Sequence, residues 1–233
     1  MTFDLEPYFE KYRSIVALAD DAFERIRKDY SECVTCRLGC ADCCHALFDL
    51  TLIEALYINR QLSGLSDQAY QRELLEKANR ADRRIHKIKR SAQKAVKEGQ
   101  GEEEVLIAMG EERVRCPLLN DKNQCKLYDH RPVVCRLYGV PLNIGGVARI
   151  CSLTHFKSGV QYPTVHMEAI QRRLHALSAE LVRDINSKYS GLADLLVPLS
   201  MALLTDYDDN YLGVESAEEK TPDQEGKGSE PHG

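Results

Sequence analysis

Five of the chain's nine cysteines fall within twelve residues, and this limits what the protein can fold into more than any other feature. The five are Cys33, Cys36, Cys40, Cys43 and Cys44. Four more follow further along the chain, at Cys116, Cys125, Cys135 and Cys151. Thiolates brought close together repel one another unless a cation holds them, and soft sulfur ligands select zinc, copper(I) or iron–sulfur centres. The sequence therefore predicts a metal site built from two separate segments.

The rest of the composition is that of an ordinary globular protein. With 233 residues, 43% of them hydrophobic, the chain can bury a core without disulfide bonds. Its first ten residues lack the charged-then-apolar pattern of a secretory signal, so we expect a cytoplasmic protein, in which clustered cysteines are more often metal ligands or redox groups than disulfides. No run of about 18 apolar residues is present, so no membrane span is expected.

The adjacent cysteines Cys43 and Cys44 indicate more than one small ion. Neighbouring side chains diverge by about 100° on a helix and point to opposite faces of a strand, so they seldom bind the same ion. We therefore favour two nearby centres, or one polynuclear cluster, over a single tetrahedral zinc. Single cysteines can also be small buried apolar residues, and among the first five Cys33 is the strongest candidate for that role.

The hydrophobic pattern predicts a mainly α-helical protein, since apolar residues recur at steps of three and four over most of the chain. This spacing predicts helices over residues 3–30, 49–64, 66–98, 102–109, 164–187 and 192–204. Ser66 is the predicted cap of the longest helix. Residues 115–154 are predicted to be irregular, with one short strand between Val134 and Leu142. We expect a single domain over residues 1–213, with helices around a cysteine-rich centre at about 33–155.

Two segments carry opposite charge. Between Gln71 and Lys97 ten basic residues stand against three acidic ones, opposite a heptad-like apolar seam. Such a face is usually a solvated helix surface, and no aromatic residues interleave with it, so nucleic-acid binding is not expected. Residues 214–233 hold six acidic residues and two lysines and are predicted to be disordered. By charge alone, this acidic tail is one candidate partner for the basic face.

The spacing of the cysteines, and the residues between them, resemble a known family. The run Cys40-Ala-Asp-Cys43-Cys44 is followed by Cys116-Pro-Leu-Leu and then by Cys125-Lys-Leu-Tyr-Asp-His-Arg-Pro-Val-Val-Cys135-Arg. Over residues 36–151 the chain resembles the zinc- or iron-chelating CxxCxxCC family, the YkgJ-like cysteine-cluster proteins. The usual first step of that family is C-x-x-C, whereas three residues separate Cys36 from Cys40. Either Cys33 or Cys36 therefore remains a candidate for the first ligand.

The resemblance implies eight metal ligands. They correspond to Cys36, Cys40, Cys43, Cys44, Cys116, Cys125, Cys135 and Cys151. The same domain occurs in flagellin lysine-N-methylase, a bacterial enzyme, but most members of the family have no assigned reaction. The resemblance thus implies a metal site more directly than it implies catalysis, and the sequence leaves open whether the protein is an enzyme.

Charged residues beside the cysteines are candidates for a supporting role. Arg131 and Arg136 flank Cys135, and their N–H groups could donate to cluster sulfurs or offset thiolate charge. Ordinary ion pairs are the equally weighted alternative. His45 and His155 also lie near cysteines in the sequence, but with eight thiolates available we expect both histidines outside the ligand set.

Other cysteine motifs fit less well. A radical S-adenosylmethionine site shares the Cys36-x3-Cys40-x2-Cys43 spacing but needs a β/α barrel, while zinc ribbons and thioredoxin-like dithiols need other spacings or strands. Because adjacent cysteines suit a polynuclear centre and arginines suit an anionic one, we predict a [4Fe–4S]-type iron–sulfur centre. We expect it to serve redox chemistry or cluster-dependent protein modification, with a protein substrate or redox partner. The alternative is a zinc-binding structural or interaction module without catalysis.

Overall fold

A computed structural model of the protein describes residues 3–37 and 39–214. Within them lie seven α-helices: α1 (Glu6–Asp29), α2 (Leu52–Ser63), α3 (Gln68–Lys97), α4 (Glu102–Glu111), α5 (Val133–Leu137), α6 (Met167–Asp184) and α7 (Leu199–Leu204). The same residues form five short strands: β1 (Asp49–Thr51), β2 (Leu142–Ile144), β3 (Val147–Arg149), β4 (Val165–His166) and β5 (Leu196–Pro198). The prediction of a mainly α-helical protein is confirmed. The predicted disorder of the acidic tail concerns residues 214–233, and all of these except Val214 lie outside the described part.

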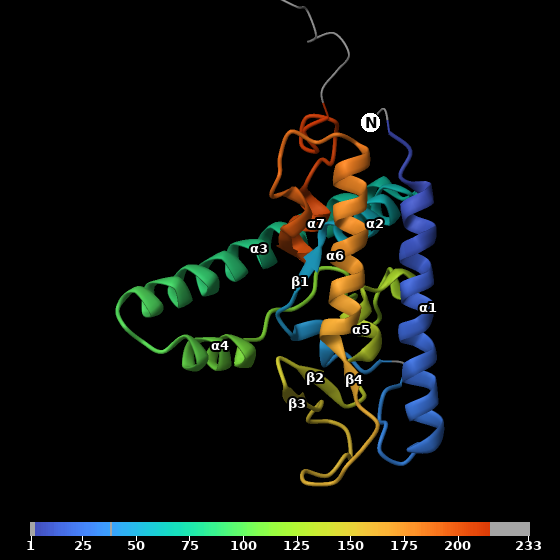
Figure 1. The fold of residues 1–233 in the computed structure, drawn as a ribbon, viewed down its shortest axis with the longest axis vertical. Coiled ribbons are helices and arrows are strands. Elements are labelled where there is room, and N and C mark those ends of the chain that lie inside the picture. The colour runs from blue at the N-terminus through green and yellow to red at the C-terminus, as the bar shows by residue number, and fades with distance from the viewer. Residues whose placement is uncertain (1–2, 38, 215–233) are drawn as a thin grey trace, which may run out of the picture.

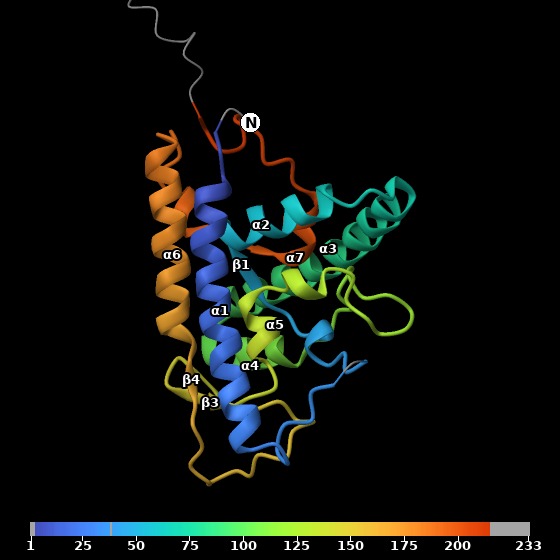
Figure 2. The ribbon, with the colours of Figure 1, turned by 90° about the vertical axis from the view of Figure 1, so that its right-hand side faces the viewer.

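Helices α1 and α6 lie side by side and run in opposite directions (Figure 1, Figure 2). The Tyr8 hydroxyl near the start of α1 donates to Asp184 at the end of α6, at 2.6 Å. Lys11 forms an ion pair with Glu180 one turn further along. The buried aromatic ring of Tyr12 packs against α2, so the apolar face of α1 that the sequence predicted is turned toward the core.

Helix α2 forms the centre of the core. Every residue from Thr51 to Ile58 is buried, including the carboxyl group of Glu54. One oxygen of Glu54 accepts hydrogen bonds from the backbone N–H and the hydroxyl of Thr51, at 3.2 and 3.0 Å, which completes a capping box. The other oxygen accepts from the backbone N–H of Val133 at the start of α5, at 3.2 Å. A single carboxyl group therefore holds the beginnings of two helices.

Helices α3 and α4, residues 68–111, form an arm that projects from the body of the molecule (Figure 1). The Asp67 side chain caps α3 by accepting from the N–H of Tyr70 at 3.0 Å, so the cap lies one residue later than the predicted Ser66. The apolar face of α3 packs on α7 and α4. Its opposite face carries six exposed cations at steps of three and four: Arg80, Arg83, Lys87, Arg90, Lys94 and Lys97. We call these six residues the basic stripe.

Two local predictions are wrong, and proline is involved in both. The helix predicted over 192–204 is a short 3₁₀ turn, then β5, then α7, because Pro198 favours an extended residue before it and β5 pairs with β1. The strand predicted between Val134 and Leu142 is instead α5, followed by β2 only from Leu142. Pro132 is the residue that precedes α5, and its fixed φ suits a helix start.

The strands β2, β3 and β4 form a small sheet next to the cysteine-rich segments. Strands β2 and β3 pair antiparallel, with Leu142 opposite Arg149, and β4 adds to β2 in parallel. Gly145 and Gly146 have φ values of 62° and 78°, which glycine adopts without strain, and they form the tight turn between β2 and β3. Among the described residues no helix is both long enough and apolar enough to cross a membrane.

Candidate metal centre

Backbone hydrogen bonds join the two cysteine-bearing segments that the sequence separates by about seventy residues. The N–H of Cys116 donates to the carbonyl of Cys44 at 2.7 Å, and the N–H of Val114 donates to the carbonyl of His45 at 2.9 Å. A β-bridge between Leu119 and Cys125 then turns the chain back, so that Cys125 lies close to Cys116. The sulfur atoms of these segments are therefore brought together by main-chain contacts.

The segment that contains Cys151 is held against the first cysteines in a similar way. The N–H of His155 donates to the carbonyl of Cys33 at 2.9 Å, and the Thr35 hydroxyl donates to the carbonyl of Leu153 at 2.8 Å. The Cys151 thiol lies 3.6 Å from a carboxylate oxygen of Asp42. This third segment brings Cys151 to the same region as Cys36 and Cys40.

Helix α5 positions Cys135, and the residues after it make room for Cys36. The hydrogen bond from Val133 to the buried Glu54 fixes the start of α5, two residues before Cys135. Gly139 follows α5, and a Cβ atom at that position would overlap the sulfur of Cys36. With the Cys36 side chain in this position, only glycine leaves room for its sulfur, so Gly139 lies against the site although it carries no side chain.

The eight cysteines that the resemblance implies lie in two groups that meet at Cys43. Three of them, Cys36, Cys40 and Cys151, interact electrostatically with one another, and we call them the outer group. The inner group consists of three others that also interact electrostatically with one another: Cys116, Cys125 and Cys135. Cys43 interacts with Cys36 of the outer group and with all three members of the inner group, while its thiol hydrogen bonds to that of Cys44.

The surroundings of these sulfur atoms favour the neutral thiol. Burial raises the pKa of Cys116 to about 12 and that of Cys135 well above its ordinary value, and neighbouring thiols add to both shifts. Partial desolvation raises the pKa of Cys36 to about 11. The hydrogen bond to Cys44, and then burial, raise the pKa of Cys43. Thiolate ligands would form here only together with a bound cation, and metal binding would release protons.

The two candidate arginines differ in what they contact. Burial raises the pKa of Cys36, Cys125 and Cys135, and the positive charge of Arg131 acts against that shift in all three. The guanidinium of Arg131 lies 3.7 Å from the centre of the Tyr128 ring. Among the two arginines, Arg131 is therefore the one whose charge reaches the sulfur atoms.

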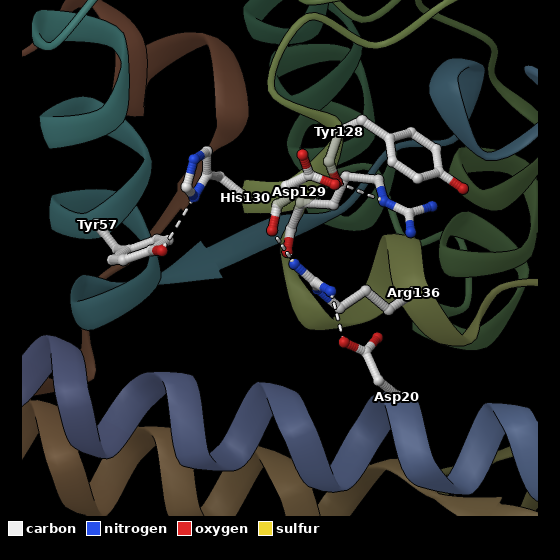
Figure 3. Close-up of polar contacts among 7 residues, drawn as sticks. Asp20, Tyr57, Tyr128, Asp129, His130 and Arg136 are labelled. Carbon is white, nitrogen blue, oxygen red and sulfur yellow. Dashed lines mark hydrogen bonds and ion pairs between the residues drawn. The ribbon is translucent and has the colours of Figure 1, made fainter.

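Arg136 connects α5 to α1 (Figure 3). Its side chain is only 8% exposed; it pairs with Asp20 at 2.7 Å and donates to the carbonyl of Asp129 at 2.5 Å. In the same view the Tyr57 hydroxyl and the ring of His130 lie within hydrogen-bond distance, at 3.0 Å. These contacts hold the loop before α5 on the core, which is an indirect contribution to placing Cys135.

Three further residues near the cysteines lie outside the two groups. Cys33 is buried in the apolar core, and the charges near its thiol belong to Glu32 and Lys157 rather than to another cysteine. The ring of His45 lies 3.0 Å from the carbonyl of Ala41, and that of His155 lies 3.1 Å from the carbonyl of Glu32. The ring of His45 thus contacts its own segment, whereas the ring of His155 contacts a segment more than a hundred residues earlier in the chain.

Sequence reasoning did not single out Asp42, Glu54 or Gly139. Asp42 pairs with Arg113 and contacts Cys151. Its position inside the cysteine run could have identified it as a residue of the site. The Thr51–Glu54 spacing is a capping-box signal, but the contact from Glu54 to Val133 depends on the fold. Nothing local marks Gly139, because its role depends on a sulfur atom about a hundred residues earlier in the chain.

The donor set suits a soft metal, although its side chains are not arranged as a closed shell. In the described part of the chain, no three Cys, His, Asp or Glu side chains are close enough to hold one metal ion together. The nearby donors are nevertheless almost all sulfur, which is the chemistry of zinc and iron–sulfur sites rather than of magnesium or calcium. Ligation requires the cysteine side chains to rotate from the arrangement described here.

Comparisons with known proteins agree with the character of this site. No curated protein matches the chain, and no solved structure does. The model of the CxxCxxCC family, described as a "putative zinc- or iron-chelating domain", matches residues 32–152. That range covers more than half of the chain and includes all nine cysteines. The protein therefore belongs to the CxxCxxCC family of zinc- or iron-chelating domains.

Proposed function

We propose that the protein is an iron–sulfur protein whose eight cysteines hold [4Fe–4S]-type centres. Membership of the family supports metal binding in general. The observation that supports [4Fe–4S]-type centres in particular is the position of Cys43. This residue interacts with both the outer and the inner group and pairs with Cys44. A [4Fe–4S] cluster takes four cysteine ligands. Each group of three lacks one, and the adjacent cysteines can supply one ligand to each.

Electrostatics suits a thiolate-bound centre, whether iron–sulfur or zinc. A cluster with four thiolate ligands carries net negative charge, and in a partly buried site this charge needs a compensating cation. Arg131 supplies such a cation to members of both groups. Four thiolates also suit zinc, so a zinc-stabilised structural or interaction module is the alternative function.

The centre would serve electron transfer or cluster-dependent modification of a protein in the cytoplasm. When bound, a cluster of this kind supplies a one-electron redox couple. The residues of the chain partly bury the inner group, offset its charge through Arg131, and fix Cys135 through α5 and Glu54. A partly exposed outer group leaves one side of the site accessible to a substrate or a redox partner.

Metal analysis of protein purified without oxygen tests the proposal. Two clusters predict brown protein with about eight iron and about eight acid-labile sulfide per chain. Cys43→Ala and Cys44→Ala are each expected to lower the iron content by about half, with Cys33→Ala as the matched control that leaves it unchanged. Colourless protein with stoichiometric zinc would overturn the iron assignment. Unchanged metal content in both variants would show that the adjacent pair is structural.

A further inference from the structure

A cavity of about 250 Å³ lies between the arm and the body of the protein. Its walls are largely apolar and come from both sides: Ala81 and Ile85 of α3, Leu106 and Met109 of α4, and Phe48 and Leu199 of the body. Cys116 of the inner group is part of the same wall. The cavity is larger than an engineered cavity of about 150 Å³ that binds benzene, so it can take one large apolar side chain.

The cavity opens into a groove along α3. Ile85 and Lys89 line the cavity and also the groove, which continues between α3 and the segment of Pro198 and Met201. Met201 is 39% exposed there. The groove therefore has apolar side chains on one wall and the cations of α3 on the other.

Positive charge continues from the groove onto the basic stripe. Arg90 lines the groove and is followed on the outer face of α3 by Lys94 and Lys97. Lys89 is neutralised by Asp49 and Lys94 by Glu98, but no ion pair engages Arg90 or Lys97 within the described residues. Asp82, the acidic residue of the groove itself, accepts a hydrogen bond from Ser200 at 3.1 Å. An acidic ligand would meet uncompensated cations along this path.

We propose that the cavity and groove form a docking site for an acidic peptide segment of another protein, with one apolar residue of that segment in the cavity. From Ile85 to Lys97 the helix rises about 18 Å, which an extended peptide of about six residues spans. The apolar anchor would pack beside Cys116, and the acidic residues would follow α3 outward. The docking site thus gives the class of partner for the proposed iron–sulfur function. Peptide binding does not depend on that function, and only the effect of the contact beside Cys116 rests on it.

Other occupants fit the groove less well. Residues 215–233 are acidic but contain no large apolar residue that could fill the cavity. Nucleic acid would meet the cations, but no Phe, Tyr or Trp side chain lines the described groove outside the cavity. A peptide that combines an apolar anchor with carboxylates matches both halves of the surface.

Fluorescence anisotropy with synthetic peptides tests the assignment on the full-length, metal-loaded protein. The probes are fluorescein-labelled peptides of about twelve Glu and Ser residues that carry either Leu or Ala at the centre. We expect the Leu peptide to bind roughly tenfold more tightly, because the cavity removes one apolar side chain from water. Equal affinities for the two peptides would overturn the proposal.

Variants then separate the cavity from the charged path. Gly110→Leu adds a side chain at the cavity wall, where a Cβ meets open space, and should abolish the preference for Leu over Ala. Gly191→Leu, at an equally open glycine outside the arm, is its matched control. Leu106→Glu changes a residue that is 67% exposed, so it tests the same wall without disturbing the core, and should weaken binding of the Leu peptide. A preference for Leu that survives both changes would contradict the assigned cavity.

Arg90→Gln combined with Lys97→Gln should weaken both peptides and flatten their salt dependence. The same charge change on α1, Arg25→Gln with Lys28→Gln, should leave binding unchanged. A single-stranded DNA that binds more tightly than the Leu peptide would make nucleic acid the ligand. A large gain in affinity on replacing Glu215, Glu218 and Glu219 by Gln would make the tail the occupant. Iron and sulfide are measured in the same samples, so a natural protein with normal metal content that binds neither peptide counts against this proposal alone.

Discussion

The arm and the cysteine centre are stabilised in different ways. The arm consists of two regular helices whose backbone hydrogen bonds and cap are local, and it packs on the body mainly through one apolar face. The centre consists of short elements that are joined by main-chain bonds between distant segments and by a buried carboxyl group. Damage to the arm should therefore stay in the arm, whereas damage to a single contact of the centre should reach both the fold and the metal ligands.

The largest effect is expected from Glu54→Ala, which removes the contact shared by α2 and α5. The backbone N–H groups of Thr51 and Val133 would lose their buried acceptor, at a cost of roughly 3–5 kcal/mol in the free energy of unfolding. Metal content should fall with it, because the start of α5 is released. Urea unfolding and metal analysis measure the two effects.

Ser178→Ala is the control for Glu54→Ala. The Ser178 hydroxyl accepts from the N–H of Ile53 at 3.2 Å, so the change orphans one buried donor of α2 without touching α5. A smaller loss of stability with normal metal content is expected. If Ser178→Ala and Glu54→Ala lower the metal content equally, Glu54 has no particular connection to the centre.

Gly139→Ala should affect the centre with a smaller loss of stability. The new Cβ would overlap the Cys36 sulfur, so that Cys36 or the chain near Gly139 must shift, at about 1–3 kcal/mol. Metal bound through the outer group should be lost first, which iron analysis would detect as a partial loss. Gly191→Ala, where a Cβ meets open space, should change neither quantity.

Asp67→Ala tests the arm, which is the other region of the comparison. Loss of the α3 cap should cost about 1 kcal/mol and leave metal content unchanged. Ser66→Ala is the paired variant, since Ser66 is the neighbouring residue that the sequence suggested as the cap, and it should have little effect. A loss of metal from Asp67→Ala would show that arm and centre are coupled more closely than their contacts indicate.

The smallest effect is a pH dependence that arises from Glu54. Burial raises the pKa of this carboxyl group above its ordinary value, although the hydrogen bonds from Thr51 and Val133 act against that shift. The folded protein therefore holds the proton more tightly than the unfolded chain does. The associated stability is fully present below the unfolded pKa and is lost as pH rises through the folded pKa.

Glu54→Gln removes this titration. The stability difference between the natural protein and the variant should therefore be larger at about pH 5 than at about pH 8. Urea unfolding at the two pH values measures it. A difference that grows with pH would mean that the hydrogen bonds outweigh burial and that the carboxylate is the favoured form.

The sequence predicted regular helices better than it predicted the centre. The periodic apolar residues of α1 and α3 gave their extents to within a few residues, because one helix face decides burial there. Around Pro198 and Pro132 the secondary structure depends on contacts with distant segments. Strand β5 forms because β1 lies beside it, and α5 forms because Glu54 accepts a hydrogen bond from its first N–H group. Such contacts leave no local pattern.

Residue identity was more informative than periodicity at the candidate site. The cysteines and the charge of Arg131 were singled out because few other roles suit a cluster of thiols. The choice between Cys33 and Cys36 as first ligand stays a prediction, although Cys33 lies in the apolar core and Cys36 lies near other thiols. The role of Gly139 could not be predicted, since a glycine signals only that space is needed and not what fills it.

The hydrogen bond from Val133 to Glu54 also bears on local opening of the protein. Five residues are too few for a helix to persist by itself, so α5 would ordinarily fray and refold within microseconds. Because its first N–H group is held by a residue of the most buried helix, opening of α5 requires opening of the core. In hydrogen exchange the amides of these two helices should therefore behave as one cooperative unit, and Cys135 should be among the last thiols to become accessible to an alkylating reagent.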